Sequence, residues 1–195
     1  MFRVLFLFLS FLGIVYGGEC QPGNECCMGC ILEGEISKKD ALYSGFLKCL
    51  ELLRDRNAKV LVEHTEKEVS TSIFSKWIEH QGGALYSIKS HMEENTNPSL
   101  ETDEVIAYGN MDECLENLEV SIDFFYLNDV QSYPNVEEIQ MHYLEEIQKV
   151  YPWLTDNSII LIDNQESAAN LAVQFLKEQG WKIVKGGVQV LLVKN

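Results

Sequence analysis

Basic residues are scarce in this chain of 195 residues, which has 15 lysines and arginines against 30 aspartates and glutamates and a formal net charge of −15. Nucleic acid and anionic lipid are bound through clustered lysine and arginine, so we expect neither as a main partner. The sequence also lacks internal repeats, low-complexity tracts and interdomain linkers. Its length suits one domain with a real core. An apolar content of 46% argues against disorder.

Long apolar runs are absent except at the start of the chain, where Arg3 precedes an apolar run from Val4 to Val15. That run has about twelve residues, whereas a membrane-spanning helix needs about twenty. We interpret residues 1–17 as a secretory signal peptide, with an uncleaved anchor as the alternative. We therefore expect a secreted or periplasmic protein that is free of the membrane after cleavage.

Four of the six cysteines follow directly, in a segment 18–36 that we interpret as a cysteine-rich leader: Cys20, Cys26, Cys27 and Cys30. An oxidising compartment favours structural disulfides. The spacing of Cys27 and Cys30 also suits a zinc or redox pair, and a disordered leader is a third interpretation. Six cysteines allow fifteen full pairings, and the sequence does not choose among them.

The other two cysteines, Cys49 and Cys114, lie on apolar helical stripes and are predicted to be small buried hydrophobes. The four histidines have no ligand spacing, so we assign no metal site.

From residue 37 to residue 195 the apolar pattern alternates between strand and helix periods. The predicted strands are 59–63, 84–88, 104–108, 122–127 and 158–162, and the predicted helices are 38–54, 68–81, 111–118, 136–150 and 167–179. Such alternation is typical of parallel β-α-β units in one sheet covered on both faces.

The end of the chain follows a different pattern. Segments 181–185 and 188–193 are strand-like and flank Gly186-Gly187, which predicts an antiparallel hairpin with a two-residue turn. We therefore predict an α/β domain over residues 37–195. Its architecture is a doubly wound, mostly parallel seven-stranded sheet that ends in an antiparallel hairpin.

This order of elements resembles the class I S-adenosylmethionine (SAM) dependent methyltransferase fold, which is Rossmann-like. The likeness is strongest in residues 122–133 (IDFFYLNDVQSY) and 180–194 (GWKIVKGGVQVLLVK), which resemble segments of small bacterial-type methyltransferases. The second of these segments belongs to the fold rather than to catalysis. If the chain is active, the resemblance implies SAM as its cofactor.

The resemblance also implies a set of cofactor-binding positions, namely Glu63, Thr65, Ser70, Lys89, Asn110, Met111 and Asn128. In the family, an acidic residue and a glycine-rich turn follow the first strand, because a Cβ there would collide with the cofactor. Glu63 stands at the acidic position, but no glycine lies between it and Ser70. Glu66 and Glu68 would moreover repel the carboxylate of SAM.

Lys89 stands where the family has an acidic residue that accepts hydrogen bonds from the ribose hydroxyls. A lysine ammonium has donors but no acceptor, and losing a charged acceptor costs about 1.5–3 kcal/mol. Asn110 and Asn128 stand where aspartate is usual, and Gln131 where histidine is usual. None of these residues is a base near neutral pH, so we assign no catalytic residue.

These departures from the family pattern favour an exported protein that has the methyltransferase fold and binds a small molecule or a protein. Its SAM-dependent activity would be weakened or lost. The alternative is an active methyltransferase on a small-molecule or protein acceptor, with Tyr133, Asp163 or a histidine placing the acceptor. Methyl transfer needs mainly in-line positioning. A third hypothesis makes the cysteine leader a cross-link to other exported chains.

Overall fold

The computed structural model describes residues 28–64, 69–89, 105–108, 110–128, 133–164 and 167–194. For His64, Lys89 and residues 105–108, the description covers the backbone alone. The predicted signal peptide, most of the cysteine leader and the predicted site residue Thr65 lie outside the described residues.

Seven strands form a single sheet in the order β3-β2-β1-β4-β5-β7-β6. Strands β1 to β5 are parallel, and β7 runs antiparallel between β5 and β6. The predicted seven-stranded, mostly parallel sheet with an antiparallel hairpin is thus confirmed. The strands are β1 (Ala58–His64), β2 (Gly83–Lys89), β3 (Val105–Tyr108), β4 (Ile122–Asn128), β5 (Leu154–Asp163), β6 (Trp181–Lys185) and β7 (Gln189–Lys194).

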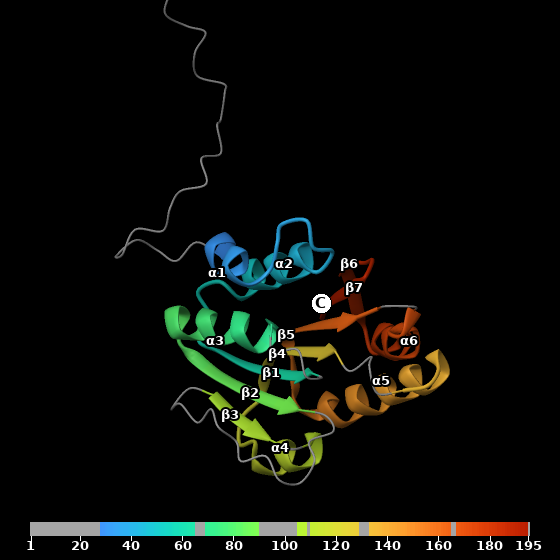
Figure 1. Ribbon diagram of the computed structural model, residues 1–195. Helices are drawn as coiled ribbons and strands as arrows, with labels where there is room; N and C mark the ends of the chain where they lie inside the picture. Colours follow the sequence, from blue (N-terminus) through green and yellow to red (C-terminus); the bar gives the residue numbers. More distant parts are fainter. Residues whose placement is uncertain are drawn as a thin grey trace, which may run out of the picture.

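Helices cover both faces of the sheet, as a doubly wound fold requires (Figure 1). One face carries α1 (Met28–Glu35), α2 (Tyr43–Leu53) and α3 (Val69–Gln81). The other carries α4 (Met111–Asn117), α5 (Val136–Val150) and α6 (Asn170–Glu178), with a short 3₁₀ turn η1 (Tyr151–Trp153) leading into β5.

The apolar run of β1 explains why this strand lies inside the sheet. Val60 and Val62 point to the face of α1, α2 and α3, whereas Leu61 points to the opposite face, and all three are fully buried. Burying such a side chain contributes about 1.5–3 kcal/mol. On the first face, the rings of Phe46 and Tyr126 pack edge to face, with their centroids 5.2 Å apart.

The packed domain begins earlier than residue 37. Helix α1 lies within the segment interpreted as a leader, and its Ile31 and Leu32 are buried in the core against α2 and α3. The predicted helix 38–54 is shorter than expected, because the Asp40 side chain accepts a hydrogen bond from the Leu42 N–H at 2.8 Å and holds a turn before α2.

The prediction of a two-residue hairpin turn is wrong. The last pair between β6 and β7 is Lys185 with Leu191, so five residues separate the paired positions. Gln189 and Val190 pair with β5 instead. The chain therefore needs a wider loop to reach β5, and Gly187 in that loop has φ +129°, a conformation that favours glycine.

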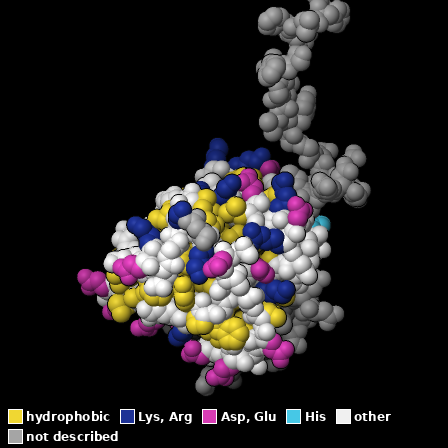
Figure 2. Space-filling view, turned by 180° about the vertical axis from the view of Figure 1, so that it is seen from behind, with side chains coloured by type: hydrophobic (Ala, Val, Ile, Leu, Met, Phe, Trp, Pro, Cys, Tyr) yellow, Lys and Arg dark blue, Asp and Glu magenta, His cyan; other side chains and the backbone are white. Residues whose placement is uncertain are grey.

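Cys49 and Cys114 are fully buried, on opposite faces of the sheet, as predicted. Figure 2 shows lysine and arginine side chains among acidic and apolar ones, so the negative charge forms no continuous acidic surface on that face. In the part of the chain that the structure describes, no helix has both the length and the apolarity to cross a bilayer.

Candidate functional site

The predicted site residues meet where the parallel strands end. In the register of the sheet, His64 at the end of β1 lies between Lys89 of β2 and Asn128 of β4. Glu63 precedes His64 and is only 3% exposed. The carboxyl edge of a doubly wound sheet is where such folds bind ligands, so three of the positions named from the sequence share one candidate site.

The start of α3 supplies two buried hydroxyl groups beside this edge. Ser70 is 3% exposed, and neither its Oγ nor the Oγ1 of Thr71 has a hydrogen-bond partner among the described residues. Both lie in the first turn of α3, where the backbone N–H groups of a helix also lack intrahelical partners. This end of the site therefore keeps unused hydrogen-bonding capacity. The sequence named Ser70 and missed Thr71, its neighbour in the same turn.

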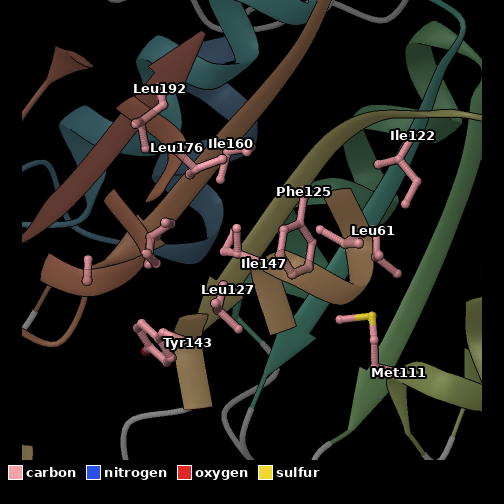
Figure 3. Close-up of a cluster of buried hydrophobic side chains, with 14 of the residues drawn as sticks. Leu61, Met111, Ile122, Phe125, Leu127, Tyr143, Ile147, Ile160, Leu176 and Leu192 are labelled. Atoms are coloured by element: carbon pink, nitrogen blue, oxygen red, sulfur yellow. The ribbon is translucent and has the colours of Figure 1, made fainter. Parts of the chain in front are cut away.

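Asn110 and Met111 follow β3, as predicted, but their side chains have structural contacts. Asn110 Oδ1 accepts a hydrogen bond from the Glu113 N–H at 2.8 Å and so caps α4. Met111 is 2% exposed and lies in the core beside Leu61 (Figure 3). The structure thus gives the amide oxygen of Asn110 and the thioether of Met111 roles in holding α4.

Asn128 is half-buried at the end of β4. After it, α5 begins with a reciprocal cap. Asn135 Oδ1 accepts from the Glu138 N–H at 3.0 Å, while Asn135 Nδ2 donates to Glu138 Oε1 at 2.7 Å. The first turn of α5 is therefore capped by the side chain of Asn135, and Glu138 holds that side chain in place.

A buried polar cluster, formed by Tyr126, Asp163 and Gln189, lies at the end of β5. Asp163 Oδ1 accepts from the Tyr126 hydroxyl at 3.1 Å and from Gln189 Nε2 at 2.9 Å. Burial raises the pKa of Asp163 from 3.8 to about 6, against the lowering effect of these two bonds. The sequence analysis named Asp163 as a residue that could position the methyl acceptor. Its side chain instead is 1% exposed and faces the core.

Asn164, the next residue, ties the end of β5 to the hairpin loop. Its Oδ1 accepts from the Ala169 N–H at 3.1 Å, and its Nδ2 donates to the Gly187 carbonyl at 3.2 Å. The Asn164 N–H donates to the Val188 carbonyl at 2.8 Å. These three bonds join the end of β5 to the hairpin loop and to the start of α6.

An open hollow of about 390 Å³ lies at the start of α5, lined by seven side chains that include three glutamates, Glu137, Glu138 and Glu145. Tyr133 and His142 line it as well, with ring centroids 4.8 Å apart. Carboxylates around a hollow favour neutral or cationic ligands over anionic ones. Among the described residues, no three His, Cys, Asp or Glu side chains gather closely enough to hold a metal ion.

Comparisons with known proteins identify the fold. No protein-family model and no curated protein matches the chain. A Podospora anserina methyltransferase solved with S-adenosylhomocysteine (SAH) matches with a TM-score of 0.53 and 12% identity, over 83% of this chain and 81% of that one. Cofactor-bound Rv0187 from MTB matches with a TM-score of 0.54 and 14% identity, over 86% and 88%. This chain has the class I SAM-dependent methyltransferase fold.

The methyltransferase fold was expected from the resemblance in sequence and is confirmed. At these identities the likeness concerns the fold alone, because a shared fold hosts many functions. The position of β7 between β5 and β6 also explains a residue that the sequence analysis missed. Gln189 interrupts the apolar run of the last strand, and this interruption was the signal for a buried polar contact.

Proposed function

We propose that this chain is an exported binding protein built on the methyltransferase fold, with SAM-dependent methyl transfer weakened or lost. One observation carries the proposal. At the carboxyl edge, the polar side chains of Asn110, Asn135, Asp163 and Asn164 are hydrogen-bonded to the protein's own backbone and side chains. Groups held in this way have little capacity left for a ligand.

The residues present do not fit SAM as a set. The β2 end carries Lys89 in place of a ribose-binding acceptor. The Asn110 oxygen caps α4, and Met111 packs into the core. The turn between Glu63 and Ser70 has no glycine. Among the described residues, the hydroxyls of Ser70 and Thr71 keep hydrogen-bonding capacity of the kind that a polar cofactor group needs.

The binding role would involve a small molecule or a protein rather than nucleic acid, because basic residues are few. The hollow at the start of α5 is a candidate location. Its three glutamates favour a neutral or cationic group, and the aromatic ring of Tyr133, which also lines the hollow, can contact a cation.

Calorimetry of the full chain with SAM and with SAH tests the proposal. We expect no measurable heat with either ligand for the wild type. A triple variant, Thr65→Gly, Lys67→Gly and Lys89→Asp, restores a flexible turn and a ribose acceptor and should gain affinity at least about tenfold, since one charged hydrogen bond contributes about 1.5–3 kcal/mol. Lys182→Asp, an exposed substitution with the same charge change as Lys89→Asp, is the matched control for that substitution and should gain none. Micromolar binding of SAM by the wild type would refute weakened cofactor use.

The second candidate is an active SAM-dependent methyltransferase, favoured by the hydroxyls of Ser70 and Thr71 at the start of α3, which have no hydrogen-bond partner among the described residues. The start of a helix favours anionic groups, so these residues would contact the carboxylate of SAM. If this candidate is correct, the wild type binds SAM and the double variant Ser70→Ala, Thr71→Ala binds it at least tenfold more weakly.

Export has a separate test. Mass spectrometry of the secreted, non-reduced protein should give a chain that begins at Gly18, with disulfides among the leader cysteines. Free thiols at Cys26, Cys27 and Cys30 would exclude the disulfides, and an intact Met1 would exclude cleavage.

A further inference from the structure

Asp163 is a buried acid without a cationic partner. Its side chain is 1% exposed, and one oxygen, Oδ1, takes both of its hydrogen bonds, from Tyr126 and from Gln189. Within the described ranges, no lysine, arginine or histidine contacts it, and the charge that acts on it is the like charge of Asp40. An ionised carboxylate in such surroundings is strongly disfavoured.

Two acceptor atoms in the same cluster have no donor. Asp163 Oδ2 and Gln189 Oε1 are both buried and lack hydrogen-bond partners in the described part of the chain. The same two side chains are already joined through their other atoms, because Gln189 Nε2 donates to Asp163 Oδ1. Protonation of Oδ2 turns that oxygen into a donor and removes the buried charge, while Oδ1 keeps its two hydrogen bonds.

Helix α2 lies directly on this cluster. A Cβ on Gly45 would come within 1.8 Å of Gln189 Oε1, so the helix backbone rests against the amide. The next residue, Phe46, contacts the Tyr126 ring edge to face. Water can therefore reach Asp163 from this side only if α2 moves away from β4 and β7.

We propose that Asp163 is a protonation-controlled latch for α2, in which the neutral acid holds the helix closed and ionisation releases it. The titratable groups that act on it are Tyr126 from β4 and Asp40 before α2. Cys49 of α2 lies in the core on the same face of the sheet, and the charge that acts on Cys49 is that of Lys185 in β6. Burial raises the pKa values of the Tyr126 hydroxyl and the Cys49 thiol well above their usual ranges, so both stay neutral.

The pKa of Asp163 determines how the opening of α2 depends on pH. Burial raises the pKa of Asp163 to about 6, so the carboxyl is neutral at pH 5 and ionised at pH 8. Opening α2 returns the carboxyl to water and to its ordinary value of 3.8. A difference of about two pKa units makes opening about a hundredfold more favourable well above pH 6 than well below pH 3.8, and about tenfold more favourable at pH 8 than at pH 5, because the open acid is already ionised at pH 5.

Hydrogen exchange of the full chain, followed by mass spectrometry at pH 5 and pH 8 and expressed as protection factors, tests the latch. We expect protection of the α2 amides to fall about tenfold from pH 5 to pH 8 in the wild type. Asp163→Asn cannot ionise and should give equal protection at both pH values. Asp156→Asn, an exposed acid on the same strand, is the matched control and should keep the wild-type response. Peptides of α5, on the other face, should not respond in any variant.

Equal α2 protection at both pH values in the wild type, or a pH response that persists in Asp163→Asn, would overturn the proposal. If Asp163→Asn does not fold, a carbon-13 titration of the wild-type carboxyl decides the matter. A midpoint near 6 that the α2 amide shifts follow supports the latch, whereas a midpoint near 3.8 overturns it.

Discussion

The carboxyl edge of this sheet has two halves that differ in how far their polar side chains are hydrogen-bonded. At the β1 half, the hydroxyls of Ser70 and Thr71 are buried and have no partner among the described residues. At the β5 half, hydrogen bonds join the side chains of Asp163 and Asn164 to Tyr126, Gln189 and nearby backbone, and the atoms without a partner among the described residues are the acceptors Asp163 Oδ2 and Gln189 Oε1. Buried polar groups normally find partners. The difference teaches that the first half retains capacity for a ligand, whereas the second serves to join β5, β7 and α2.

The largest expected effect concerns the pH dependence of stability at the β5 half. The folded-state pKa of Asp163 is raised to about 6 from 3.8, so the folded state binds more protons between these values and its stability falls as pH rises through them. Urea unfolding should show the wild type losing about 3 kcal/mol relative to Asp163→Asn between pH 3.5 and pH 7. A constant difference between the two proteins across this range would contradict the assignment.

The contact between α2 and Gln189 gives the next effect. Gly45→Ala places a Cβ within 1.8 Å of Gln189 Oε1 and should destabilise the fold by about 2 kcal/mol, measured by urea unfolding. Gln189→Ala in the same background removes the collision and should recover part of the loss. Gly34→Ala on α1 is the control, because its Cβ meets nothing within 4 Å, and it should stabilise α1 by about 0.5–1 kcal/mol.

The caps at the edge give a smaller effect. Asn110→Ala removes the bond to the Glu113 N–H and should reduce the free energy of unfolding by about 1 kcal/mol. Asn110→Asp keeps the capping oxygen and should retain wild-type stability in the same thermal unfolding experiment. If Asn110→Ala has no effect on stability, Asn110 is free for a ligand and the proposal of a closed site weakens.

The smallest effect is expected at Ser70. Ser70→Ala breaks no hydrogen bond of the described chain and should change stability by less than about 0.5 kcal/mol. Ser158→Ala is the matched buried serine, because its Oγ donates to the Ile122 carbonyl at 2.6 Å and accepts from the Thr155 N–H at 2.8 Å. Its replacement should cost about 1–3 kcal/mol. Equal losses for the two serines in urea unfolding would remove the contrast between the halves.

The apolar periodicity of the sequence predicted helices and strands well where one face of the element is apolar. The bounds of α5 agree with the prediction, because Ile139, Tyr143 and Ile147 recur at helical spacing and all three are buried. The pattern failed at α1, where cysteines and glycines obscured the buried pair Ile31 and Leu32. It also failed at β5, which begins at Leu154 rather than residue 158, because Leu154 pairs with Ile122 across a register shift.

The candidate site was less predictable than the fold. Strand ends are local features, so the sequence could place Glu63, Lys89 and Asn128 at one edge. The cluster of Asp163, Tyr126 and Gln189 joins residues 26 and 37 positions apart under a helix from elsewhere in the chain. Long-range polar contacts of this kind depend on the register of the sheet, which periodicity alone does not give.

The position of β7 has a consequence for how the molecule is made. Residues 189–194 form an inner strand that pairs with both β5 and β6. During synthesis, β5 therefore stays unpaired on this side until residues 189–194 have emerged from the ribosome. We expect chaperones to engage the chain before these residues emerge, and a chain truncated before residue 189 should be prone to aggregation.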